Sequence, residues 1–67
     1  MPDPTHEPII QFFAYEHLRD DLQGVSRPFG ELATLIVDTL PRNAERSTAL
    51  RKLLEAKDAA VRASIAK

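Results

Sequence analysis

The stretch from Asn43 to Lys67 contains neither proline nor glycine, so nothing in it stops a helix once one has begun. Asn43 is a residue type that caps helix N-termini well, and Pro41 ends any helix that precedes it. We therefore predict a helix of about six turns that begins after Asn43.

A second helix is predicted upstream, where apolar residues recur at steps of three and four. These residues are Leu22, Val25, Phe29, Leu32, Ile36 and Leu40. Pro28 interrupts the pattern, so either one helix kinks there or Ser26 caps a new helix with Pro28 in its first turn. The connection to the last helix is only about residues 41–43. Because connections this short join antiparallel neighbours, residues 20–67 should form a helical hairpin.

The N-terminal part of the chain is harder to assign. Residues 1–8 hold three of the five prolines and no apolar periodicity, and we expect a disordered or extended arm. The segment "IIQFFAYEHL" is predicted as a short helix, with an extended docking segment as the alternative, and both Phe12 and Phe13 are expected in the core. The predicted fold is all-α: a single domain, residues 9–67, with a short N-terminal helix before a long antiparallel hairpin.

The last helix has an unusually wide apolar face. On a helical wheel, Ala49, Leu53, Ala56, Ala60 and Ala63 form one stripe, and Leu50, Leu54, Val61 and Ile65 form another beside it. Together the stripes cover about half of the circumference, whereas one partner helix needs only about 100°. A small chain without cysteine also needs stabilisation from elsewhere. We therefore expect a homo-oligomer of hairpins.

Two cations, Arg46 and Lys57, fall near the middle of this apolar face. A cation buried there without a partner would cost several kcal/mol. One interpretation keeps Arg46 near solvent in the first turn and lets Lys57 extend its charged end outward. The other interpretation is a phosphate site assembled where subunits meet.

Candidate ligand-binding residues lie in three segments. Tyr15, next to Phe13 and His17, offers an aromatic ring on which a base could stack. Arg27, directly before Pro28, could reach a phosphate or stack on a base, or be an ordinary solvated arginine.

The third segment is the start of the last helix. Arg46 and Ser47 lie in its first turn, where free N–H groups and the helix dipole favour anions, and Lys52 is a candidate second phosphate contact. A plain capping turn and a solvated lysine are the structural alternatives.

Several function classes are disfavoured. The chain has no cysteine and no histidine–carboxylate spacing typical of a triad. It has neither a glycine-rich phosphate loop nor a metal-ligand cluster. We therefore expect that the protein is not an enzyme and uses no cofactor or metal. A net charge of −1 argues against a general DNA or RNA binder. The apolar runs are too short for a membrane span, and the first ten residues carry acids rather than the cations of a signal peptide, which predicts a cytosolic protein.

The segments "FAYEHL" and "LPRNAERSTALRKLLEAKDAAVRASIAK" and the hairpin between them resemble the phage anti-CBASS cyclic-nucleotide sponges, which share a hairpin domain with the anti-Thoeris sponges. The similarity covers residues 12–67. Its most specific parts are the F-x-Y element at Phe13 and Tyr15 and the S-x-A-L-x-K-L-x-E-A core from Ser47 to Ala56. Lys57 departs from the apolar residue expected of the family.

The resemblance implies a compact homohexamer that binds cyclic di- and trinucleotide immune signals without cleaving them. Tyr15 would be the stacking tyrosine, and Arg27, Arg46, Ser47 and Lys52 would be phosphate contacts. Two other functions stay open. A helical-hairpin module or phage regulator that grips a host protein would use the same apolar face, and a helix-turn-helix DNA binder would need a basic recognition helix that this chain lacks.

Overall fold

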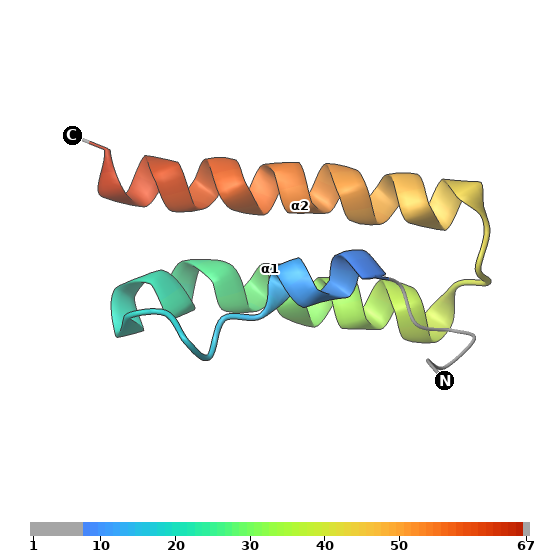
Figure 1. Ribbon diagram of the computed structural model, residues 1–67, viewed down its shortest axis with the longest axis horizontal. Coiled ribbons are helices and arrows are strands. Elements are labelled where there is room, and N and C mark those ends of the chain that lie inside the picture. Colours follow the sequence, from blue (N-terminus) through green and yellow to red (C-terminus); the bar gives the residue numbers. More distant parts are fainter. Residues whose placement is uncertain (1–7, 67) are drawn as a thin grey trace.

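The computed structural model describes residues 8–66, and this part of the chain contains helices and no strand. A short 3-10 helix, η1 (Pro8–Phe13), precedes two long helices, α1 (Asp20–Thr39) and α2 (Ala44–Ile65). The long helices run antiparallel, and η1 runs alongside α1 and contacts both long helices (Figure 1). The predicted all-helical hairpin is therefore confirmed. The expected arm lies outside the described residues, apart from Pro8, where η1 begins.

The turn between the long helices follows the local signals in the sequence. α1 ends at Thr39, and the backbone N–H of Leu40 donates to the Ile36 carbonyl oxygen. Asn43 caps α2, and its side-chain oxygen accepts from the backbone N–H of Arg46 at 2.8 Å. Residues 40–43 thus close the hairpin, as Pro41 and Asn43 predict.

α1 continues through Pro28 as one helix, so the alternative in which a new helix begins at Ser26 is wrong. Pro28 has no N–H to donate to the Gly24 carbonyl, and Gly24 is exposed, so water can satisfy that carbonyl. Ser26 does not cap a helix. It lies inside α1, fully buried, and its Oγ has no hydrogen-bond partner.

The core is small and lies where η1, α1 and α2 meet. Phe13, Ala33 and Leu50 are its buried members, and each comes from a different element. Phe12 was also expected in the core, and that prediction was wrong, since Phe12 is 56% exposed while Phe13 is 3% exposed. The two adjacent rings cannot both face inward from one turn of a 3-10 helix.

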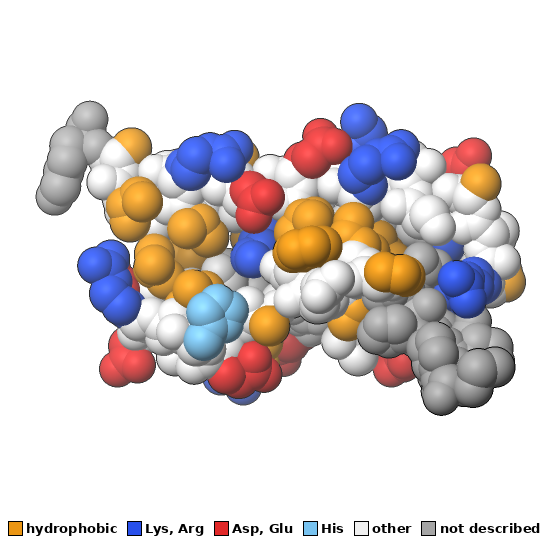
Figure 2. Space-filling model, viewed as in Figure 1, with side chains coloured by type: hydrophobic (Ala, Val, Ile, Leu, Met, Phe, Trp, Pro, Cys, Tyr) orange, Lys and Arg blue, Asp and Glu red, His pale blue; other side chains and the backbone are white. Residues whose placement is uncertain are grey.

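Apolar side chains remain uncovered on the single chain. Figure 2 shows hydrophobic side chains gathered between the long helices, with Lys and Arg side chains around them. On α1, Leu32 and Leu35 are 44% and 55% exposed. On α2, Ala56 and Ala63 of the predicted alanine stripe are exposed as well. One hairpin therefore leaves part of the wide apolar surface in solvent.

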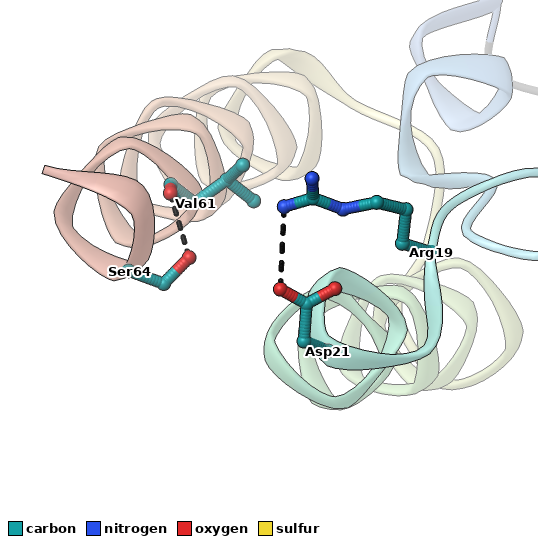
Figure 3. Close-up of polar contacts among 4 residues, drawn as sticks. All are labelled: Arg19, Asp21, Val61 and Ser64. Atoms are coloured by element: carbon teal, nitrogen blue, oxygen red, sulfur yellow. Dashed lines mark hydrogen bonds and ion pairs between the residues drawn. The ribbon is translucent and has the colours of Figure 1, made fainter.

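Local polar contacts mark the open end of the hairpin (Figure 3). Arg19, just before α1, lies 3.3 Å from the carboxylate of Asp21, and both side chains are exposed. Ser64 Oγ donates to the Val61 carbonyl oxygen at 2.8 Å in the last turns of α2. These contacts stay within one helix end each and contribute little to stability.

Candidate functional site

Tyr15 lies in the loop between η1 and α1, and its ring rests against α1 at Gly30. An added Cβ at Gly30 would lie 3.2 Å from both Cδ1 and Cε1 of Tyr15, and 3.0 Å from the Phe13 carbonyl oxygen. These distances are shorter than ordinary contacts of a Cβ atom. The absence of a side chain at Gly30 therefore lets the loop and the ring approach the helix this closely.

Hydrogen bonds hold the loop that carries Tyr15. The backbone N–H of Leu18 donates to the Tyr15 carbonyl oxygen at 3.0 Å, which closes a turn. The side-chain amide of Gln23, in the first turns of α1, donates to the Leu18 carbonyl oxygen at 2.6 Å. This hydrogen bond joins the part of the loop between Tyr15 and α1 to the first turns of α1.

Two hollows lie on either side of Tyr15. The larger, of about 360 Å³, is bounded by η1, the loop and the middle of α1, and its lining includes Ile10, Phe13, Tyr15, Glu16, Glu31 and Thr34. The smaller, of about 300 Å³, is lined by Tyr15, Asp20, Gln23, Gly24 and Arg27. Tyr15 is the residue common to both. Volumes of this size are at the lower end of those that hold small ligands.

Arg27 is the cation of this region. Its side chain is exposed on α1, and its Nε lies 3.5 Å from a carboxylate oxygen of Glu31, one turn further along the helix. Two residues that the sequence singled out separately, Tyr15 and Arg27, thus line the same hollow. A ring and a guanidinium together can hold a flat, negatively charged ligand.

The predicted site residues on α2 are placed elsewhere. Among the described residues that line the two hollows, none comes from α2. Ser47 is exposed in the first turn of that helix. Lys52 is exposed too, and its Nζ lies 3.9 Å from Glu55. Tyr15 and Arg27 are therefore brought together within one chain, whereas Ser47 and Lys52 stay apart from them.

Arg46 is only 3% exposed, and its guanidinium is used inside the hairpin. Its Nη1 donates to the carbonyl oxygens of Val37 and Leu40, at 3.1 and 3.0 Å. Carbonyls at a helix C-terminus lack partners within the helix and form the negative end of its dipole, and the last turn of α1 has no basic residue of its own. Arg46 supplies that cation from the other helix. Its expected phosphate contact stays a prediction.

Lys57 is the cation from α2 that binds a carbonyl oxygen at the end of η1. Its Nζ donates to the Phe12 carbonyl oxygen at 2.6 Å, near the end of a helix that also lacks a basic residue in its last turn. The cations in the apolar face of α2 therefore each meet carbonyl oxygens at the end of another helix. The sequence pattern located both cations but gave no indication of these partners.

Gly30 and Glu31 line the larger hollow but were not predicted as site residues from the sequence. Glu31 could have been found as the acid four residues after Arg27. No pattern marked Gly30, because the need for glycine arises from a loop that packs on it. Among residues 8–66, no group of three His, Asp or Glu side chains is placed to hold a metal ion.

Comparisons of the chain with protein-family models, with curated proteins and with solved structures gave no match. Within the described residues, no helix has the length and apolar content needed to cross a membrane. The function must therefore be argued from the geometry of the site and from the resemblance stated above.

Proposed function

We propose that this protein is a phage-encoded sponge that sequesters cyclic di- and trinucleotide immune messengers without cleaving them, and so blocks CBASS-type signalling in the host. The observation that supports this proposal most is the shared hollow of Tyr15 and Arg27. A cyclic dinucleotide combines flat bases with phosphates. The ring would stack on a base, and the guanidinium would bind a phosphate.

The ion pair of Arg27 and Glu31 is compatible with this role. Both side chains are more than 60% exposed, and their contact distance is 3.5 Å. Such a surface pair contributes at most about 1 kcal/mol, so a phosphate can displace the carboxylate at little cost. A doubly hydrogen-bonded phosphate would bind the guanidinium more strongly than Glu31 does.

Assembly into a homo-oligomer, a hexamer by resemblance, is part of the proposal. Both hollows are open to solvent at the surface of a single chain, and Leu32 and Leu35 are exposed on the same helix as Arg27. A second copy packed on these leucines would bury them and could supply matching groups to a two-fold symmetric ligand.

Ser47 and Lys52 are proposed for a separate trinucleotide pocket. They are exposed on α2, away from Tyr15, so they would meet ligand only where subunits come together. Arg46 is a weaker candidate for ligand contact, since its guanidinium already binds two carbonyl oxygens.

The proposal is tested by calorimetric titration of the purified protein with a panel of cyclic di- and trinucleotides, and by recovery of the ligand after heating the complex. We expect binding of at least one cyclic nucleotide and its intact release. No binding across the panel would reject the sponge, and a linear nucleotide among the released products would show an enzyme instead.

A helical-hairpin module that binds a host protein is the second candidate. The exposed Phe12, Leu32 and Leu35 favour it, because apolar side chains at a surface often mark a protein contact. This function needs neither the ring of Tyr15 nor Arg27. A protein that binds no cyclic nucleotide and stays monomeric would support this second candidate.

A further inference from the structure

We infer that Gly30 is a positioning residue, which sets where the ring of Tyr15 lies and thereby maintains the two hollows. Gly30 is buried in the middle of α1, where its backbone is helical and needs no conformation special to glycine. Alanine favours a helix interior more than glycine does. Helix formation therefore gives no reason for glycine at this position.

The reason lies in the space around Gly30. An added Cβ would meet two different parts of the N-terminal segment, the Phe13 carbonyl oxygen at 3.0 Å and one edge of the Tyr15 ring at 3.2 Å. The methyl group of alanine would thus push the backbone after η1 and the ring away from α1. Both hollows are lined by Tyr15, so both would change shape.

The chain contains a matched comparison. Gly24 lies in the same helix, and an added Cβ there would have no atom within 4 Å. Gly24→Ala therefore shows the effect of helix propensity alone, and Gly30→Ala shows that effect together with the displacement of Tyr15. Gly24→Ala is the control for measurements of stability and fluorescence. It is not a control for ligand binding, because Gly24 lines the smaller hollow, so Arg62→Ala, at an exposed position, is used there.

The position of Tyr15 can be followed without any ligand. Tyr15 is the single tyrosine of the chain, and there is no tryptophan, so intrinsic fluorescence reports on this ring. We expect Gly30→Ala to keep its helical circular dichroism and to make the fluorescence easier to quench with acrylamide. We expect Gly24→Ala to raise the thermal unfolding midpoint and to leave quenching as in the parent. Equal quenching of Gly30→Ala and the parent would overturn the inference.

Ligand affinity gives a second measurement, which rests on the proposed function. Gly30→Ala should weaken binding of a cyclic dinucleotide by at least about tenfold, as expected when a base–aromatic stack is lost. In a Tyr15→Ala background, Gly30→Ala should cause no further loss, because it acts through the ring. A further loss there would mean that Gly30 acts on the ligand by another route. If the parent binds no cyclic nucleotide, the proposed function fails, and quenching still decides the role of Gly30.

Should Gly30→Ala fail to fold, the double variant Tyr15→Ala, Gly30→Ala decides the cause. A folded double variant would show that the ring requires glycine at position 30 and would support the inference. An unfolded double variant, with Tyr15→Ala alone still folded, would show that the close approach of the Phe13 carbonyl requires glycine, and the assignment to Tyr15 would be wrong.

Discussion

Lys57, in the second half of α2, donates a hydrogen bond from its Nζ to the carbonyl oxygen of Phe12, 45 residues earlier in the chain. This bond joins η1 to the hairpin at the end of a helix whose last turn has no basic residue of its own. It also explains why a cation is tolerated in the apolar face of α2. Lys57 is half-buried, and the length of its stem lets the charged end reach an oxygen.

Replacing Lys57 with methionine should therefore destabilise the protein. The change keeps an apolar stem of similar length and removes the donor, so we expect the free energy of unfolding to fall by about 1–2 kcal/mol. Urea denaturation followed by circular dichroism measures it. Lys52→Met is the matched control on the exposed face, and its effect should be below about 0.5 kcal/mol. Equal effects of the two changes would argue against the bond to Phe12.

Arg46→Ala should be more severe than Lys57→Met. It removes a buried guanidinium that binds two carbonyl oxygens at the end of α1, and we expect a loss of about 2–3 kcal/mol in the free energy of unfolding. Arg62→Ala, in the exposed last turns of α2, is the control. If Arg46→Ala is as stable as the parent, these carbonyl oxygens accept hydrogen bonds from water instead. Ligand binding by Arg46→Ala should be compared at equal folded fraction.

Tyr15→Ala and Arg27→Ala test the proposed site directly. Each should weaken binding of a cyclic dinucleotide by at least about tenfold, the first through loss of a stack and the second through loss of a phosphate contact. Calorimetry measures both, with Arg62→Ala as the control. Unchanged affinity in a folded Tyr15→Ala protein would remove the residue on which the proposal depends most.

The exposed leucines of α1 test the proposed assembly. Leu35→Glu places a charge among apolar side chains that a second copy would bury, so it should shift the protein toward the 7.5 kDa monomer in light scattering. Ala59→Glu, at an exposed position on α2, is the comparison. A monomeric parent protein would contradict the assembly. If only Ala59→Glu dissociates an oligomer, the contact is made by α2.

The fold could be predicted from the sequence where the signals are local. Asn43 and Pro41 set the turn, because capping and proline geometry depend on a few neighbouring residues. The path through Pro28 could not be predicted, since packing of the whole helix outweighs the loss of one hydrogen bond. The choice between Phe12 and Phe13 depended in the same way on how η1 lies against the hairpin.

The candidate site could be predicted only in part, because several of its contacts depend on tertiary packing. Tyr15 and Arg27 were recognisable by their chemistry, and the structure places them at one hollow. The partners of Arg46 and Lys57 are backbone oxygens, which every residue has, so no pattern of side chains indicates them. The requirement for glycine at position 30 depends on a loop whose course the sequence does not reveal.

The long sequence separation between Lys57 and Phe12 has a consequence for the order of folding. Residues 40–43 bring α1 and α2 together at a small entropic cost, whereas η1 must be held against a helix that is distant in the chain. The N-terminal segment should therefore dock last and open first, and amide hydrogens of residues 9–19 should exchange sooner than those of the hairpin. Because Tyr15 belongs to that segment, each opening dismantles both hollows, and a bound ligand would slow exchange in these residues more than anywhere else in the protein.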